Sequence, residues 1–107
     1  MKTSLTLAVL ASIGLAAPVS THAAGSADAA RNKVSMCIGC HGIPLYRTAY
    51  PEVYHVPKIA GQTPEYIVKA LQAYKSGERG HPSMTGIARG LTDADMADLA
   101  AYYGKAK

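Results

Sequence analysis

The chain has 107 residues, so a single domain is expected. Its formal net charge at pH 7 is +4, without a dense run of Lys and Arg interleaved with aromatic residues, so nucleic-acid binding is not expected. The chain has 7 Tyr but no Trp and no Phe, and is therefore short of the aromatic side chains that fill a core. A domain this small has marginal stability unless something reinforces it.

The first residues have the pattern of an export signal. Lys2 gives a positive start, an apolar run follows from Leu5 to Ala17, and small residues stand at Ala23 and Ala24. This order predicts a cleaved secretory signal over residues 1–24 and a mature domain over residues 25–107. The apolar run is shorter than the roughly 20 residues that cross a bilayer. We therefore expect no integral membrane span after cleavage, with an uncleaved anchor as the alternative.

The mature residues predict three helices and no strands. The first helix is expected over residues 27–36, behind Ser26 as its N-cap. The second is expected to start at Thr63, with Pro64 at the first helical position, and to stop at Gly77. Apolar residues recur along this second helix at helical spacing, at Tyr66, Ile67, Ala70, Leu71 and Tyr74.

The third helix is expected to start at Thr92, with Asp95 placed to complete a capping box, and to end at Gly104. Two stretches rich in Pro and Gly separate the helices, at residues 42–62 and 78–91, and are predicted to be non-helical. Loops of this length in a small domain are commonly functional or wrap something. The sequence therefore predicts an all-α domain with functional loops.

The run C-I-G-C-H at residues 37–41 has the C-x-x-C-H pattern of haem c attachment. The thiols of Cys37 and Cys40 can each add to one of the two haem vinyl groups, and His41 can then bind the iron. The chain contains only one such run, so one haem is expected. A large apolar cofactor would also supply the core material that the composition lacks.

Three alternatives to haem attachment have weaker support. A disulfide between Cys37 and Cys40 would close only a tiny loop and would stabilise the fold little. A thioredoxin-like redox pair needs a βαβ context, which the sequence does not suggest. A structural zinc site needs four ligands, and only His41, His55 and His81 could join the cysteines, without the usual paired spacing.

A second axial ligand would close the iron to other molecules, and methionine in that position also raises the reduction potential. Met84 lies in a stretch rich in Pro and Gly that can bring its thioether over the far haem face. Met36 is too close to Cys37 to reach that face, and Met96 is expected in the core. His81 is the competing ligand, although a surface or hydrogen-bonding role is favoured for it.

These runs together resemble a bacterial class I monohaem c-type cytochrome over essentially the whole mature chain. The resemblance rests on residues 37–42, 56–62 with Tyr66, 81–84, 91–95 and 99–103. It implies a small all-α cytochrome c fold, with three to four helices wrapped around one covalently bound haem c. It also implies attachment through Cys37 and Cys40, and iron ligation by His41 and Met84. Finally, it suggests that the Pro57 carbonyl accepts a hydrogen bond from His41.

The stretch 42–56 departs from this resemblance, because it is longer than the short glycine-rich loop of many relatives. It is rich in Tyr and Pro, at Pro44, Tyr46, Tyr50, Pro51 and Tyr54. It could cover a haem edge, or it could be a packing loop that supplies aromatic area, which is the favoured interpretation. Five basic residues could ring an exposed haem edge or be evenly solvated: Lys58, Lys69, Lys75, Arg79 and Arg89.

The function expected from these features is that of a periplasmic carrier of single electrons rather than an enzyme. Its partners would be redox proteins, an electron donor and an acceptor, and it would be a monomer in solution. One alternative is the haem subunit of a larger periplasmic oxidoreductase. A less favoured one is a haem sensor or peroxidase with an open sixth position on the iron.

Overall fold

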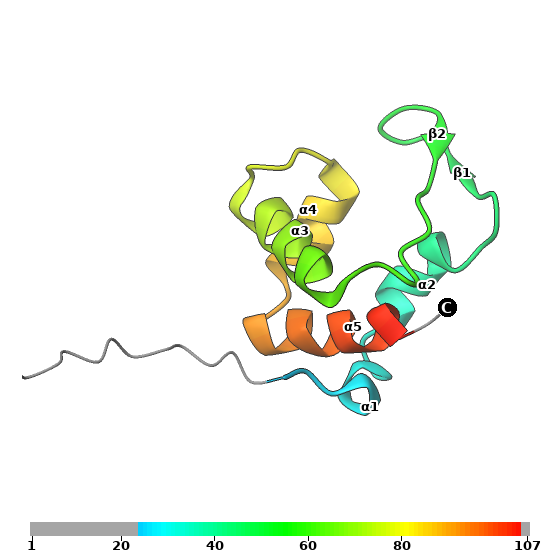
Figure 1. Cartoon of the computed structure of the whole chain (residues 1–107). Helices are drawn as coiled ribbons and strands as arrows, with labels where there is room; N and C mark the ends of the chain where they lie inside the picture. The colour runs from blue at the N-terminus through cyan, green and yellow to red at the C-terminus, as the bar shows by residue number, and fades with distance from the viewer. Residues whose placement is uncertain (1–23, 106–107) are drawn as a thin grey trace, which may run out of the picture.

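The computed structural model describes residues 24–105, which form five helices and one small hairpin (Figure 1). The predicted export signal lies outside these residues, apart from its last residue. Within the described part, none of the helices has the length and apolar character needed to cross a membrane. The elements in chain order are α1 (Ala27–Ala30), α2 (Ser35–His41), β1 (Arg47–Thr48), β2 (Tyr54–His55), α3 (Pro64–Ser76), α4 (Pro82–Arg89) and α5 (Asp93–Lys105).

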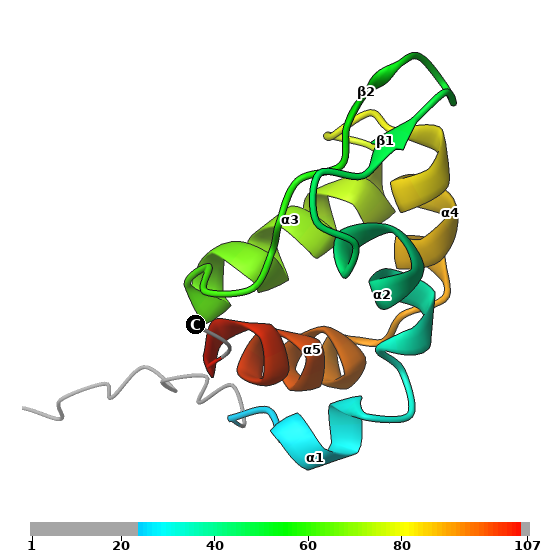
Figure 2. The ribbon, with the colours of Figure 1, turned by 90° about the vertical axis from the view of Figure 1, so that its right-hand side faces the viewer.

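The helix α5 lies at the centre of the packing. Both α1 and α3 pack against it, and α4 packs against α3. The hairpin extends from the end of the molecule opposite α5, as both ribbon views show (Figure 2). Met96 is fully buried, as expected of a core residue. The core cluster consists of Ala30, Ile67, Leu91, Met96, Leu99, Ala100 and Tyr103.

Several predicted helix ends are confirmed. Ser26 caps α1, and Pro64 is the first residue of α3. Gly77 ends α3 with a φ of 88°, in the left-handed region that glycine adopts readily. At the start of α5, the Thr92 amide donates to Asp95 Oδ2 at 2.9 Å, and the Asp95 amide donates to the Thr92 hydroxyl at 3.1 Å. This is the predicted capping box.

The prediction of one helix over residues 27–36 is wrong. α1 ends at Ala30, and residues 31–34 form turns before α2 begins. In these turns the Lys33 amide donates to the Ala30 carbonyl at 2.7 Å. This bond spans three residues and closes a tighter turn than the four-residue bond of an α-helix. The chain therefore changes direction, and α2 carries the whole C-x-x-C-H run instead of leading up to it.

The prediction that residues 78–91 are non-helical is also wrong, because they contain α4. Pro82 occupies the first helical position, where its missing N–H is no loss. Gly90 follows the last helical residue. Met84, Ile87 and Ala88 recur at helical spacing in between, and Ala88 is fully buried. Pro82, this apolar spacing and Gly90 were the signals for a short helix that the sequence offered.

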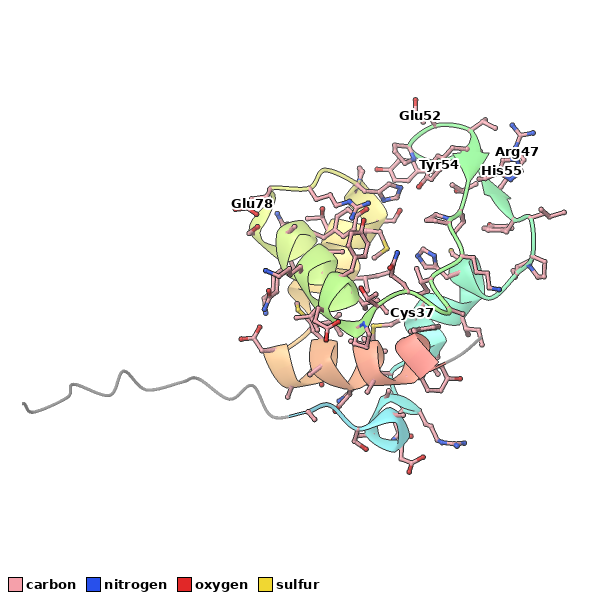
Figure 3. All side chains as sticks on the ribbon, in the orientation of Figure 1. Cys37, Arg47, Glu52, Tyr54, His55 and Glu78 are labelled. Carbon is pink, nitrogen blue, oxygen red and sulfur yellow. The ribbon has the colours of Figure 1, made fainter. Side chains whose placement is uncertain are left out.

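The hairpin in residues 42–62 overturns the prediction of no strands. Arg47 pairs with His55, and Thr48 pairs with Tyr54. Because side chains alternate between the faces of a strand, each pair lies on its own face. Thr48 and Tyr54 are half-buried on the inner face, whereas Arg47 and His55 are exposed and point outward (Figure 3).

An ion-pair cluster attaches the start of the chain to α5. Lys33 Nζ lies 2.5 Å from a carboxylate oxygen of Asp95 and 3.2 Å from one of Asp98. The Ser26 amide donates to the other oxygen of Asp98 at 2.7 Å. The hydrogen bond from Lys33, with those from Thr92, lowers the pKa of Asp95 from its ordinary 3.8 to about 2. The same pairing raises the pKa of Lys33.

The lowered pKa of Asp95 predicts an acid-dependent loss of stability. Between pH 4 and pH 2 the unfolded chain binds more protons at this carboxyl than the folded chain, so stability rises with pH there. Lys33→Gln is expected to lower the free energy of unfolding near pH 6 and to flatten its fall between pH 4 and 2. Denaturant titrations at a series of pH values measure both. Lys69→Gln, on the exposed face of α3, is the control, and a wild-type slope in Lys33→Gln would contradict the prediction.

Gly104 lies inside α5 and does not end it, contrary to the prediction. A Cβ at this position would lie 2.7 Å from Pro64 Cγ and 3.3 Å from the Gln62 carbonyl oxygen. The pyrrolidine ring and the backbone cannot move aside easily. Glycine therefore allows α5 to approach the start of α3 closely.

Gly104→Ala is expected to lower the free energy of unfolding by about 1–3 kcal/mol, because overpacking outweighs the better helix propensity of alanine. Denaturant unfolding of the haem-loaded protein measures this. The matched control is Gly86→Ala in α4, where a Cβ meets nothing within 4 Å. That change is expected to stabilise by up to about 1 kcal/mol. Equal stability of the two variants would show that the close approach at Gly104 is unimportant.

Candidate haem site

The three residues of the predicted attachment motif share one face of α2. Cys37, Cys40 and His41 stand at positions i, i+3 and i+4 of this helix, which meet on one side. Cys37 and His41 line a cavity of about 210 Å³. Cys40 and His41 line a second cavity of about 70 Å³. The local helix therefore directs all three side chains to the same region.

The two cysteines are not joined in a disulfide, and Cys37 is half-buried whereas Cys40 is exposed. Burial raises the pKa of the Cys37 thiol. Burial also raises the pKa of Tyr103 to about 12. The Tyr103 hydroxyl is buried without a hydrogen-bond partner among residues 24–105, beside the larger cavity. Both groups are therefore neutral at pH 7.

The two cavities adjoin, because they share four wall residues: Met36, His41, Met84 and Ile87. His41 comes from α2 and Met84 from α4, so an imidazole and a thioether border the same space from different elements. Apolar residues of α3, α5 and the preceding loop line the larger cavity, among them Ile59, Ile67, Ala70, Leu71 and Leu99. These residues fit a flat apolar cofactor whose metal takes one nitrogen and one sulfur ligand.

The predicted contact between His41 and Pro57 is present. His41 Nδ1 lies 2.6 Å from the Pro57 carbonyl oxygen. A carbonyl can only accept, so Nδ1 carries the proton, and the lone pair is on Nε2. The Gly61 amide donates to the Tyr103 carbonyl at 2.9 Å and ties the Pro57 segment to α5. The imidazole is therefore held in the tautomer and orientation that a metal ligand needs.

Met84 lies in the first turn of α4 and is half-buried. His81 is the N-cap of this helix, and its Nδ1 accepts a hydrogen bond from the Met84 amide at 3.2 Å. Its Nε2 is hydrogen-bonded to the Tyr54 hydroxyl. His81 thus has the hydrogen-bonding role that the sequence favoured. Met36 lies on α2 with His41 and is 44% exposed.

The hairpin contributes residues to the site that the sequence did not assign. Thr48, Tyr50 and Tyr54 line the smaller cavity beside His41 and Met84. Tyr50 is nevertheless 63% exposed, so the favoured interpretation of a packing loop is wrong for this residue. The unusual Tyr content of the stretch was the only signal. That these residues border the smaller cavity depends on how the hairpin folds over the site, and residue spacing in the sequence does not reveal this.

The basic residues follow neither of the two expected patterns completely. Lys58 and Arg79 line the larger cavity. Lys75 Nζ donates to the Leu91 carbonyl at 2.5 Å, and the Arg79 guanidinium lies 4.9 Å from the centre of the Tyr74 ring. Two of these cations therefore border the site, and a third is bound to the backbone.

A small helical domain that presents C-x-x-C-H to an apolar cavity, with a methionine on another wall, has the construction of a c-type haem protein. A family model described as Cytochrome c matches residues 28–106, and the chain belongs to this family. It is a bacterial class I c-type cytochrome with the cytochrome c fold. Family membership implies a covalently bound haem c with its iron.

Named relatives show the extent of this similarity. Cytochrome c4 of Pseudomonas aeruginosa is 40% identical over 86 residues, which cover 80% of this chain and 41% of the relative. Cytochrome c-554(548) of Halomonas halodenitrificans is 40% identical over 83 residues, covering 75% and 95%. The thiosulfate dehydrogenase electron acceptor of Thiomonas intermedia is 33% identical over 107 residues, covering 100% and 45%. The chain thus spans less than half the length of the cytochrome c4 that it matches.

Proposed function

We propose that the chain is a periplasmic carrier of single electrons with one haem c. Cys37 and Cys40 hold the haem, and His41 and Met84 bind its iron. When bound, the haem supplies an iron that exchanges single electrons between its ferric and ferrous states. Its partners are an electron donor and an acceptor protein, and the chain is not itself an enzyme.

The hydrogen bond between His41 and Pro57 carries the proposal. It leaves Nε2 of His41 unprotonated and free to bind a metal, on the helix that also bears both cysteines. Met84 borders the same cavity from α4. A histidine, a methionine and two thiols around one apolar space match His/Met ligation of an attached haem.

The walls of the cavity favour fast and reversible electron exchange. Ile67 and Leu99 are 7% and 1% exposed, so they exclude water from this side of the site. Pro57 orients His41, and the helical turn of α4 holds Met84. Since both side chains are held by the fold, they need to move little when the charge of the site changes. Small rearrangement is what a carrier of electrons requires.

The sequence supports the cellular location and the single haem. The residues before the described part carry the features of an export signal over 1–24, which would leave a mature domain over 25–107. One C-x-x-C-H run provides for one haem.

Met84→Leu tests the axial ligand, because it removes the thioether and nearly preserves volume. The reduction potential is expected to fall by on the order of 0.1 V, within the roughly 0.8 V range that axial ligands span. The reduced variant is also expected to bind carbon monoxide rapidly, whereas the wild type resists it. The matched control is Met36→Leu, which should keep the wild-type potential. An unchanged potential in Met84→Leu would show that Met84 is not an axial ligand. Rapid binding of carbon monoxide by the reduced wild type would favour a haem sensor.

A second candidate is the cytochrome subunit of a larger oxidoreductase. Apolar side chains are exposed along α2 and the hairpin segment, and such patches mark interaction sites. Leu45 is 88% exposed, with a φ of 59° that is uncommon for a leucine. One relative, from Chlorobaculum tepidum, is named as the cytochrome subunit of sulfide dehydrogenase. The exposed residues in this region are Met36, Ile38, Ile43, Leu45, Tyr50 and Val53.

Native purification separates the two candidates. A free carrier is expected to leave a mild periplasmic extract as a monomer of its own mass, because transient electron-transfer encounters use small interfaces. A subunit would instead co-purify with a partner at fixed stoichiometry. The double change Leu45→Ser and Val53→Ser should then release it. Size-exclusion chromatography with haem absorbance measures both results.

A further inference from the structure

The residue that caps α4 makes its cap bond to Met84 itself. Pro82 has no amide hydrogen, and the first intrahelical bond runs from the Thr85 amide to the His81 carbonyl at 2.8 Å. The Met84 amide is thus one of the orphan donors at the helix start, and His81 Nδ1 satisfies it at 3.2 Å. A helix of 8 residues is marginal by itself, so its first turn depends on this cap.

The hydrogen bonds also determine the tautomer of His81. Nδ1 accepts from the backbone, so in the neutral ring the proton lies on Nε2. Nε2 can then donate to the Tyr54 hydroxyl, which is its other partner. The ring stands edge-on to two tyrosines, at 5.4 Å from the ring of Tyr54 and 6.5 Å from that of Tyr74. The orientation of the cap is therefore set from both sides.

Tyr54 belongs to the inner face of the hairpin, where it pairs with Thr48. In Figure 3 it lies between the hairpin and the helices, while Arg47 and His55 lie on the outer side. Tyr54, His81 and Met84 all line the smaller cavity, which Cys40 and His41 also border. The hydrogen bond thus connects the segment that follows the attachment motif to the helix that carries Met84.

We propose that Tyr54 and His81 form a clasp that positions Met84 over the haem iron. His81 holds the first turn of α4 through its cap bond, and Tyr54 holds His81 to the hairpin. Both are positioning residues, since they act on Met84 and not on the reacting centre. This inference rests on the proposed role of Met84 as axial ligand. It gives the unusual hairpin a function in keeping the sixth position of the iron closed.

The experiment titrates the ferric holoprotein with imidazole, which competes with Met84 for the iron. Its apparent affinity rises as the fraction of protein with Met84 detached rises. Tyr54→Phe removes one hydrogen bond, and His81→Asn keeps a good cap but loses the bond to Tyr54. Each is expected to raise the affinity about fivefold, the effect of about 1 kcal/mol. His81→Ala loses both hydrogen bonds and is expected to raise the imidazole affinity about 25-fold.

The double variant Tyr54→Phe with His81→Asn tests whether the two side chains act together. Because either change alone breaks the bond between the two side chains, the double variant is expected to raise the imidazole affinity about fivefold, and not by the product of the two single effects. His55→Ala, on the outer face of the same hairpin, is the matched control and should keep wild-type affinity. The clasp would be overturned if the effects of the two changes on imidazole affinity were additive in the double variant, or if His81→Asn raised this affinity as much as His81→Ala. The latter result would indicate His81 as the ligand, which asparagine cannot replace.

Failure of the clasp is distinguishable from failure of the ligand assignment. If Met84→Leu lowers the potential but His81→Ala and Tyr54→Phe bind imidazole like the wild type, Met84 is the ligand and the clasp is overturned. A fall in melting temperature without a change in imidazole affinity has the same meaning, since it shows a structural role only. If Met84→Leu changes neither potential nor affinity, the ligand assignment itself is wrong.

Discussion

The packing of α1 and α3 against α5 determines where the walls of the haem site stand. Gly104 lets α5 approach the start of α3. The ion pairs of Lys33 with Asp95 and Asp98 join α5 to the turns before α2. The carbonyl of Tyr103 holds the segment that orients His41. The described core is small, so these few contacts support a cavity that the cofactor completes.

The hairpin segment meets the site on both sides. It leads directly into Pro57, whose carbonyl fixes the ring of His41, and its inner face presents Tyr54 to His81 at the start of α4. The stretch 42–56, which departs most from the family resemblance, also lines the smaller cavity beside both proposed ligands. Its exposed apolar residues, Leu45 and Val53 among them, lie on the same segment as these contacts. One segment thus combines the support of the site with a surface suited to a partner.

Features that depend on neighbours in the chain were predictable. The cap at Ser26, the capping box of Thr92 and the stop at Gly77 use hydrogen bonds and dihedrals within a few residues. The start of α4 was missed because Pro82 has two meanings, a breaker inside a helix and a favoured residue at its first position. Only the packing of Ala88 and its neighbours decides between them.

The sequence by itself determined the chemistry of attachment, because two thiols and an imidazole at spacings of three and four residues form a haem motif wherever they occur. It also predicted the helical class of the fold. Tertiary structure decided that Met84 borders the same cavity as His41, and that Tyr54 is hydrogen-bonded to His81 at the start of α4. Tyr54 and His81 are 27 positions apart, and His41 and Met84 lie still further apart, so only the packing of the helices brings these residues together.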